Sequence, residues 1–430
     1  MAKLYDTSPE AEKAILVGVF LKGEDRDEAL ELLDELEQLA NTAGAEVIEK
    51  IYQELPAFNP ATLLGKGKLQ EIKELAELED VHLIIFDNEL SPIQMRNLSN
   101  ELQIKVLDRS GLILDIFSKN ARTTEAQLEV QLAQMQYLLP RLSRMWAHIS
   151  EQYGGIGTRG PGETQLESDR RVVRHHIQIL KEKLQQIDKQ NKEQRKQRKK
   201  MPRFALVGYT NSGKSTLMNT ITDANVLVEN KLFATLSTTV RQFTLPNNKP
   251  ALLSDTIGFI RKLPHHLIAS FRTTLAEANE SDVLLQVSDI TNQNFRVMIN
   301  TVNETLEDIG IKDKPMIYVF NKIDKLDSLD LLHQLQSEYP QSVFISAERG
   351  INVTTLLERM QNEYEKYNST FSLLIPYSAG ADMNKLYENA EILERNDDNE
   401  GTHLQIKVES RNKDKLMPLI RKYLKEEKLI

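Results

Sequence analysis

Residues 204–216, Phe-Ala-Leu-Val-Gly-Tyr-Thr-Asn-Ser-Gly-Lys-Ser-Thr, decide the fold of the middle of this chain. A short apolar run leads into a loop with a glycine near each end, and a helical segment follows. This is the pattern G-x-x-x-x-G-K-[ST], in which backbone N–H groups surround a phosphate at the positive end of a helix. Lys214 would lie between the β- and γ-phosphates, and Ser215 would offer a hydroxyl to Mg²⁺. We expect the whole loop to bind nucleotide: Gly208, Tyr209, Thr210, Asn211, Ser212, Gly213, Lys214, Ser215 and Thr216.

Three later segments extend this site and select the base. Asp255-Thr-Ile-Gly258 follows an apolar strand, so that Asp255 can hold Mg²⁺ and the Gly258 N–H can meet a γ-phosphate. Asn321-Lys-Ile-Asp324 follows another strand, and its last carboxylate can accept from guanine N1–H and the 2-amino group, which adenine does not present. A P-loop kinase would share the first motif but not this one. A backbone N–H at Ser346-Ala347 could reach guanine O6. The expected contacts here are Asp255, Thr256, Ile257, Gly258, Asn321, Lys322, Asp324, Ser346 and Ala347.

The segment between 232 and 240 is expected to sense the γ-phosphate. A hydroxyl there would complete the Mg²⁺ shell only when that phosphate is present. We choose Thr235, with Phe233 and Ala234 beside the nucleotide; Thr238 and Thr239 are alternatives. The predicted metal ligands are therefore Ser215, Thr235 and Asp255, and the predicted catalytic residues are Lys214, Thr235 and Gly258.

Phe259 occupies the position where many GTPases carry a glutamine that orients water. Phenylalanine cannot orient water. Hydrolysis by this chain alone should therefore be slow and should need a partner.

The first part of the chain, 1–115, is predicted to be a small α/β domain. Apolar runs at 14–20 and 81–86 are expected to be strands, and 25–39 and 91–102 to be helices, an alternation that implies a parallel sheet. Gly65-Lys-Gly-Lys68 could belong to a second nucleotide site, but a turn that begins a helix is favoured because no full phosphate-binding signature is present. Asp87 and Asp108, at strand ends, are expected to be structural rather than metal-binding.

Residues 116–200 are predicted to form an antiparallel helical hairpin. Apolar residues recur at spacings of three and four from Leu128 to Trp146 and again from Val173 to Ile187, and Pro140 should kink the first helix. The polar segment between the helices, 154–167, is rich in glycine, and is either a flexible connector or a loop shaped by a partner. We favour the second reading because the loop is longer than a turn between helices needs. Its candidate RNA contacts are Gly155, Gly157, Arg159, Gly160 and Gly162.

Composition limits the alternatives. The 430 residues contain no cysteine, no apolar run long enough for a bilayer span and no apolar leader at the N-terminus, so a cytoplasmic protein without disulfides is expected. A net charge of -9 taken alone argues against a nucleic-acid partner, but charge is unevenly distributed. Acids dominate 24–38, whereas Lys and Arg dominate 181–200.

The nucleotide domain should extend over 201–365, a mixed, mostly parallel sheet with flanking helices. A small α+β domain should follow at 366–430. We expect a strand at 371–376, a helix to about Arg395, a strand at 404–408 and a basic helix to the end.

The chain resembles the HflX family of translational GTPases over roughly residues 10–365. Three motifs carry the resemblance, GGIGTRGPGETQLE at 154–167, LFATLSTTVR at 232–241 and DTIGF at 255–259, and it extends over ATLLGKGKLQEI and VLDRSGLILDIF in the N-terminal domain. Ser237 departs from the family pattern, in which an acidic residue followed by proline is expected.

The resemblance implies a cytoplasmic, monomeric factor that binds GTP and GDP with Mg²⁺, docks on the large ribosomal subunit and splits stalled ribosomes. The ribosome would stimulate its GTP hydrolysis. Two alternatives stay open: an RNA-binding ribosome-assembly module in which GTP is mostly structural, and a signalling GTPase with a protein partner.

Overall fold

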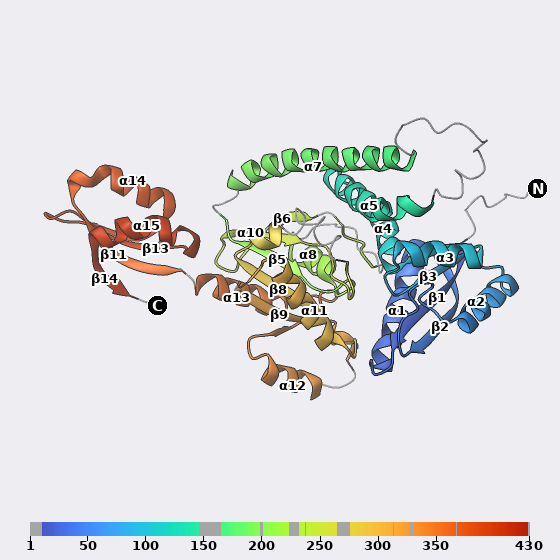
Figure 1. Cartoon of the computed structure of the whole chain (residues 1–430). Helices are drawn as coiled ribbons and strands as arrows, with labels where there is room; N and C mark the ends of the chain where they lie inside the picture. Colours follow the sequence, from blue (N-terminus) through green and yellow to red (C-terminus); the bar gives the residue numbers. More distant parts are fainter. Residues whose placement is uncertain are drawn as a thin grey trace, which may run out of the picture.

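The structure, a computed structural model, describes residues 11–145, 165–197, 201–222, 232–236, 238–264, 276–312, 314–326, 330–366 and 368–428. Three separate β-sheets lie along the molecule, one in each of an N-terminal, a central and a C-terminal domain (Figure 1). The central sheet lies between the other two. In the part of the chain described, no helix has both the length and the apolarity needed to cross a membrane.

The N-terminal domain is a four-stranded parallel sheet in the order β2-β1-β3-β4, which confirms the expected α/β alternation. β1 lies inside the sheet and is buried on both faces, so its side chains form a continuous apolar run. β2, which the sequence patterns do not single out, pairs along the whole length of β1. The elements are β1 (Glu12–Leu21), α1 (Arg26–Ala43), β2 (Ala45–Leu55), α2 (Lys66–Leu78), β3 (Leu83–Phe86), α3 (Pro92–Leu102), β4 (Lys105–Asp108) and α4 (Arg109–Asn120).

Local signals set the ends of these helices. The Asp25 side chain caps α1, and Gly44 ends it with φ 89°, a left-handed conformation that glycine adopts at low cost. Ser91 and Gln94 form a reciprocal capping box at the start of α3. Gly65 precedes the first turn of α2, so Gly65-Lys-Gly-Lys68 begins a helix, as favoured from the sequence.

Helices α5 (Thr124–Met145) and α7 (Gln165–Gln197) pack against each other through the predicted apolar stripes. Leu132, Ile177 and Leu180 are buried at this contact. Pro140 lies inside α5. Of the glycine-rich loop, 154–164 lies outside the described residues, and so do all five candidate RNA contacts; residues 165–167 belong to α7.

The central domain has a six-stranded sheet in the order β10-β9-β8-β5-β7-β6, in which only β6 runs antiparallel to its neighbour. This confirms the predicted P-loop GTPase fold. Its elements are β5 (Arg203–Val207), α8 (Lys214–Thr222), β6 (Thr239–Thr244), β7 (Pro250–Asp255), α10 (Ala276–Glu280), β8 (Val283–Asp289), α11 (Phe295–Asp308), β9 (Met316–Asn321), η1 (Ile323–Lys325), α12 (Asp330–Glu338), β10 (Val343–Phe344) and α13 (Val353–Glu365).

One apolar cluster joins the N-terminal and central domains. It includes Phe117 of α4 together with Phe233 and Phe259 of the central domain. The rings of Phe117 and Phe233 meet edge to face, with centroids 4.7 Å apart. The two domains therefore share a core beside the predicted phosphate-sensing segments.

The C-terminal domain is an antiparallel sheet in the order β12-β13-β11-β14, and it corrects two expectations. The helix predicted to about Arg395 ends at Asn389, because residues 391–397 pair with β13 as a hairpin strand. The final basic helix ends at Tyr423 and a strand follows it. The elements are β11 (Ser369–Ile375), η2 (Tyr377–Ala379), α14 (Gly380–Asn389), β12 (Glu391–Asp397), β13 (Thr402–Val408), α15 (Ser410–Tyr423) and β14 (Leu424–Lys428).

Candidate nucleotide site

The phosphate loop connects β5 to α8, as its sequence predicts. Gly208 and Gly213 have φ of 151° and 93°. A Cβ on Gly208 would lie 2.2 Å from the Val287 carbonyl oxygen, and one on Gly213 would lie 2.2 Å from the Asn321 amide nitrogen. Only glycine fits both positions, so the two glycines let the loop pass close to β8 and β9.

Lys214 is buried at the start of α8. Its Nζ donates to the carbonyl oxygens of Gly208, at 3.1 Å, and Tyr209, at 2.7 Å. Burial lowers the pKa of this amine to about 8, and the Asp255 carboxylate opposes the change. The amine thus lies within the phosphate loop, where an anionic phosphate would favour its charged form.

The three predicted metal ligands come together. The Ser215 hydroxyl donates to Asp255 Oδ2 at 2.6 Å and lies 2.9 Å from the Thr235 hydroxyl. Asp255 is fully buried at the end of β7, and in the described part of the chain its Oδ1 has no hydrogen-bond partner. Burial raises the pKa of this carboxyl, against the pull of Lys214 and the two hydroxyls. Hard oxygen donors and an unsatisfied carboxylate oxygen fit Mg²⁺.

Among the alternatives to Thr235, Thr239 is the first residue of β6 and pairs with Asp255 through the backbone. The Thr235 hydroxyl lies 2.9 Å from the hydroxyl of Ser215. Ala234 precedes it, and Phe233, with φ 56°, is anchored by the N-terminal domain. The geometry therefore favours Thr235.

Residues 258–262 are expected to respond to the γ-phosphate as residues 232–240 are, and the two stretches are called the second and the first switch segment. The second switch segment lies directly against the phosphate loop. The Phe259 N–H donates to the Gly208 carbonyl at 3.1 Å, and the Thr210 N–H donates to the Phe259 carbonyl at 2.8 Å. A Cβ on Gly258 would lie 3.1 Å from Lys214 Nζ, so Gly258 lies next to the lysine. The Phe259 side chain is buried in the core shared with the N-terminal domain.

The residues predicted to recognise guanine are joined to the phosphate loop. Asn321, at the end of β9, donates to the Ser212 carbonyl and accepts from the Ala347 N–H, both at 2.9 Å. Lys322 Nζ donates to the Asn211 carbonyl at 3.0 Å and to Asp289 at 2.5 Å. These contacts hold the ends of β8 and β9, together with Ala347, against the phosphate loop.

The Asp324 carboxylate accepts a hydrogen bond from Ser346, which lowers its pKa, and Arg349 acts in the same direction from 3.4 Å. The Ser346 and Ala347 N–H groups have protein partners, the Ile351 carbonyl and Asn321 Oδ1. Asp289 and Arg349 were not expected at this site. The sequence does contain a pattern that could have indicated Asp289, because it is an acidic residue at the end of the mostly apolar run 283–289.

Other predicted contacts have structural partners. The Thr256 hydroxyl donates to the Leu206 carbonyl at 2.7 Å, and Ile257 is buried in the shared core. The Thr216 carbonyl accepts from Thr220, whose hydroxyl also donates to the Ala347 carbonyl at 2.7 Å. These residues shape the site through their backbone positions.

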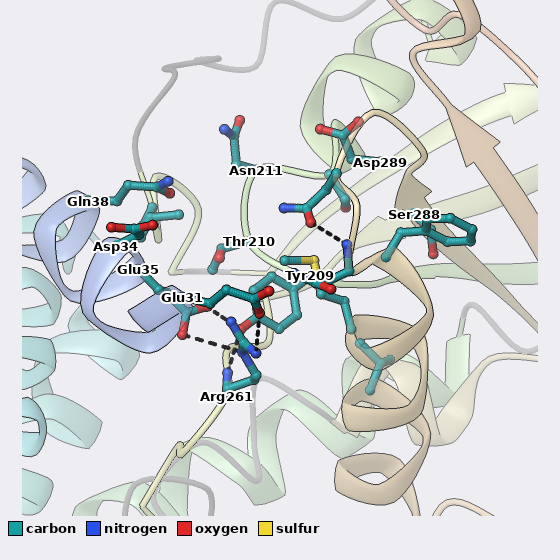
Figure 2. Close-up of a pocket in the computed structure, with 17 residues that line it drawn as sticks. Glu31, Asp34, Glu35, Gln38, Tyr209, Thr210, Asn211, Arg261, Ser288 and Asp289 are labelled. Atoms are coloured by element: carbon teal, nitrogen blue, oxygen red, sulfur yellow. Dashed lines mark hydrogen bonds and ion pairs between the residues drawn. The ribbon is translucent and has the colours of Figure 1, made fainter. Parts of the chain in front are cut away.

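The Tyr209 side chain points away from the phosphate loop and toward the N-terminal domain. It lines an open cavity of about 320 Å³ together with residues of α1, the phosphate loop and α11. Figure 2 shows Tyr209 and Arg261 converging with Glu31 and Glu35 of α1. The predicted nucleotide contact of Tyr209 is thus restricted to its backbone.

Asp87 and Asp108 form ion pairs, as favoured from the sequence. Asp87 pairs with Arg109 and Lys262, and Asp108 pairs with Arg141 and caps α4. Within the described ranges, no group of three or more His, Cys, Asp or Glu could hold a metal ion.

Comparison with known proteins finds similar sequences along most of the chain. The chain matches three sequence families: "GTP-binding GTPase N-terminal" over residues 30–118, "GTP-binding GTPase Middle Region" over 120–198, and "50S ribosome-binding GTPase" over 203–322. A solved GTP-binding protein of Sulfolobus solfataricus, in complex with GDP, is 27% identical, with 82% of this chain and 98% of that one covered at a TM-score of 0.43.

Relatives that match three quarters or more of the chain carry the assignment. GTPase HflX of Caldanaerobacter subterraneus is 43% identical over 97% of this chain and 96% of the relative. GTPase HflX of Escherichia coli is 38% identical over 90% of each chain. That of Flavobacterium psychrophilum is 51% identical over 76% of this chain and 80% of its own. With the site and fold described above, these matches show that the chain belongs to the GTPase HflX family.

Proposed function

We propose that this protein is a cytoplasmic, monomeric factor that binds the large ribosomal subunit in its GTP state, separates stalled ribosomes and then hydrolyses GTP to GDP and phosphate. The observation that carries the switch is the convergence of Ser215, Thr235 and Asp255 beside Lys214. Thr235 lies on a segment that the N-terminal domain contacts, so a change at the γ-phosphate can reach that domain. The ribosomal partner is supported by the match to the 50S ribosome-binding GTPase family.

Each group at the site has a separate task. The phosphate-loop backbone and Lys214 would hold the β- and γ-phosphates, and the Gly258 N–H would meet the γ-phosphate. Ser215, Thr235 and Asp255 would hold Mg²⁺, which when bound neutralises charge on the phosphate oxygens. Asp324 would select guanine.

The buried Phe259 ring explains why we expect slow hydrolysis without a partner. It packs in the shared core and supplies no hydrogen bond that could orient water. The ribosome would then complete the site. Gly155, Gly157, Arg159, Gly160 and Gly162 remain the proposed RNA contacts.

The decisive experiment compares GTP hydrolysis with and without purified large subunits. We expect at least a tenfold stimulation, and co-sedimentation with subunits in a non-hydrolysable GTP analogue but not in GDP. Equal binding in both nucleotides would contradict the switch. Lys214→Ala should abolish nucleotide-dependent binding. The assembly-module alternative predicts instead that Lys214→Ala still binds RNA and that large subunits do not raise the hydrolysis rate of the wild-type protein.

A further inference from the structure

A buried polar network crosses the boundary between the N-terminal domain and the nucleotide site. Its centre is Glu35 of α1, which is only 7% exposed although it belongs to the acidic run at 24–38. One carboxylate oxygen accepts from the Tyr209 hydroxyl of the phosphate loop. The other accepts from Arg109 of α4 and lies 4.0 Å from Arg261 Nε in the second switch segment.

Tyr209 connects this carboxylate to the backbone of the switch. Its hydroxyl donates to Glu35 and accepts from the Arg261 N–H at 2.6 Å. Burial and the neighbouring carboxylate raise the pKa of this phenol, so it stays protonated and keeps its donor. One side chain of the phosphate loop therefore holds both domains together at a switch residue.

Charges at this boundary are balanced. Arg109 pairs with Glu35 and, at 2.6 Å, with Asp87. Lys262 pairs with Asp87 at 2.6 Å. The Arg261 guanidinium lies 3.3 Å from Glu31. Each of these three basic side chains therefore has an acidic partner on α1 or directly after β3. A buried charge deprived of its partner is costly, and the network therefore favours one position of residues 261–262.

The position of Gly258 follows from these restraints. Between Gly258 and Arg261 the chain is fixed at Phe259 by two backbone hydrogen bonds to Gly208 and Thr210. It is fixed at Arg261 by the hydroxyl of Tyr209, the residue between those two. The orientation of the Tyr209 side chain depends in turn on Glu35. Phe259 cannot orient water as a glutamine side chain would, so hydrolysis should depend more strongly on a fixed position of the backbone in this segment.

From this geometry we infer that Glu35 of the N-terminal domain is a positioning residue for GTP hydrolysis, acting on Gly258 through Tyr209 and Arg261. Glu35 does not contact the nucleotide. Its effect should fall on the rate of the chemical step and not on nucleotide affinity, because the phosphate loop, Lys214 and Asp324 remain in place. This inference rests on the hydrolysis part of the proposed function and does not depend on ribosome binding.

The test measures single-turnover GTP hydrolysis and GDP affinity in the full-length protein. Glu35→Gln removes the charge that pairs with Arg109 and Arg261. Tyr209→Phe keeps every charge and removes only the bridging hydroxyl, so it tests the same link with little risk to folding. We expect each variant to hydrolyse GTP 3- to 10-fold more slowly with a GDP Kd within twofold of the wild type. The double variant should be no slower than the slower single variant, because both changes break one link.

Glu37→Gln is the matched control. Glu37 lies on the same helix and pairs with Lys50 of the N-terminal domain at 2.9 Å, so its removal should leave hydrolysis unchanged. Unchanged or faster hydrolysis in both Glu35→Gln and Tyr209→Phe would overturn the inference. A parallel loss of GDP affinity would overturn it too, since that would indicate damage to the phosphate loop. Absence of hydrolysis in the wild-type protein would instead contradict the proposed function.

Discussion

The N-terminal domain shares an apolar cluster and a buried ionic network with the GTPase domain, whereas the C-terminal domain has a core of its own. At the first boundary, Phe117 meets Phe233, and Asp87 pairs with Lys262. At the second, the ion pair of Lys249 with Glu391 joins side chains that are 41% and 46% exposed. Exposed pairs contribute little to stability, because water screens them.

We therefore expect the first boundary to couple the N-terminal domain to the bound nucleotide, and the second boundary only to hold the C-terminal domain in place. On the GTPase side, the first boundary includes Phe233 and Lys262, one from each switch segment, so a movement of the N-terminal domain and a change at the γ-phosphate share the same contacts. By linkage, if a bound nucleotide stabilises the contacts at this boundary, intact contacts raise the affinity for that nucleotide by the same factor. The two ion pairs described at the second boundary, Lys249 with Glu391 and Lys407 with Glu365, involve neither switch segment, which predicts a C-terminal domain that is energetically independent of the nucleotide.

The largest effect is expected from Phe117→Ala. Removing this fully buried ring should lower the free energy of unfolding by about 3–5 kcal/mol, and should free Phe233 next to Thr235. Affinity for a GTP analogue should therefore fall more than affinity for GDP, which does not need Thr235. Urea unfolding and nucleotide titration check both effects.

Phe371→Ala is the matched variant in the C-terminal core, where Phe371 is 1% exposed. We expect a similar loss of stability, confined to the C-terminal domain, with the ratio of the two nucleotide affinities unchanged. An equal change of that ratio in both variants would contradict the proposed difference between the two boundaries.

Asp87→Asn should have the next largest effect. The substitution keeps the shape of the side chain and removes a charge that Arg109 and Lys262 share, each at 2.6 Å. We expect the free energy of unfolding to fall by about 1–3 kcal/mol. Glu71→Gln, which breaks the exposed pair with Lys68, is the control and should change stability by less than about 0.5 kcal/mol. Equal losses in the two variants would show that the boundary network is not specially stabilising.

Much of the nucleotide site could be predicted from sequence because its residues belong to short motifs that follow strands, although the contacts between the motifs, such as Asn321 with Ser212, span up to 109 residues. Lys214, Asp255 and Asn321 each lie at a fixed offset from a strand end, and parallel strands bring those ends to one edge of the sheet. The network around Glu35 could not be predicted in the same way. Glu35 is 74 residues from Arg109 and 174 from Tyr209, and no local pattern specifies such pairs.

Two signals in the sequence were nevertheless available. Glu35 lies three residues after Leu32 and four before Leu39, so helical spacing places this acid on the apolar stripe of α1. Residues 391–397 have helix-forming composition, which led to the wrong prediction of a helix. The segment Asp397-Asp-Asn-Glu-Gly401 that follows is typical of a hairpin turn, and pairing with β13 outweighs local propensity.

A smaller effect is expected from Asn120→Ala. The Asn120 amide donates to the Phe233 carbonyl at 2.9 Å, a single hydrogen bond across the boundary. Its loss should cost about 1 kcal/mol and lower affinity for a GTP analogue more than for GDP. Asn97→Ala removes a comparable bond, to the Ala61 carbonyl at 3.0 Å, inside the N-terminal domain. The control should leave both affinities unchanged. A selective loss of GTP-analogue affinity in Asn97→Ala would show that the effect of Asn120→Ala is not specific to the boundary between the two domains.

The smallest effect is expected from Lys249→Ala at the C-terminal boundary. Because both partners are exposed, loss of the pair with Glu391 should change the free energy of unfolding by about 0–1 kcal/mol, and less at high salt. GTP hydrolysis should stay within twofold of the wild-type rate. Lys249 lies in the turn between β6 and β7, and β7 ends at Asp255, so a path to the predicted metal ligands exists along the strand. A change of more than twofold in the hydrolysis rate would show that the C-terminal domain is coupled to the nucleotide site through β7.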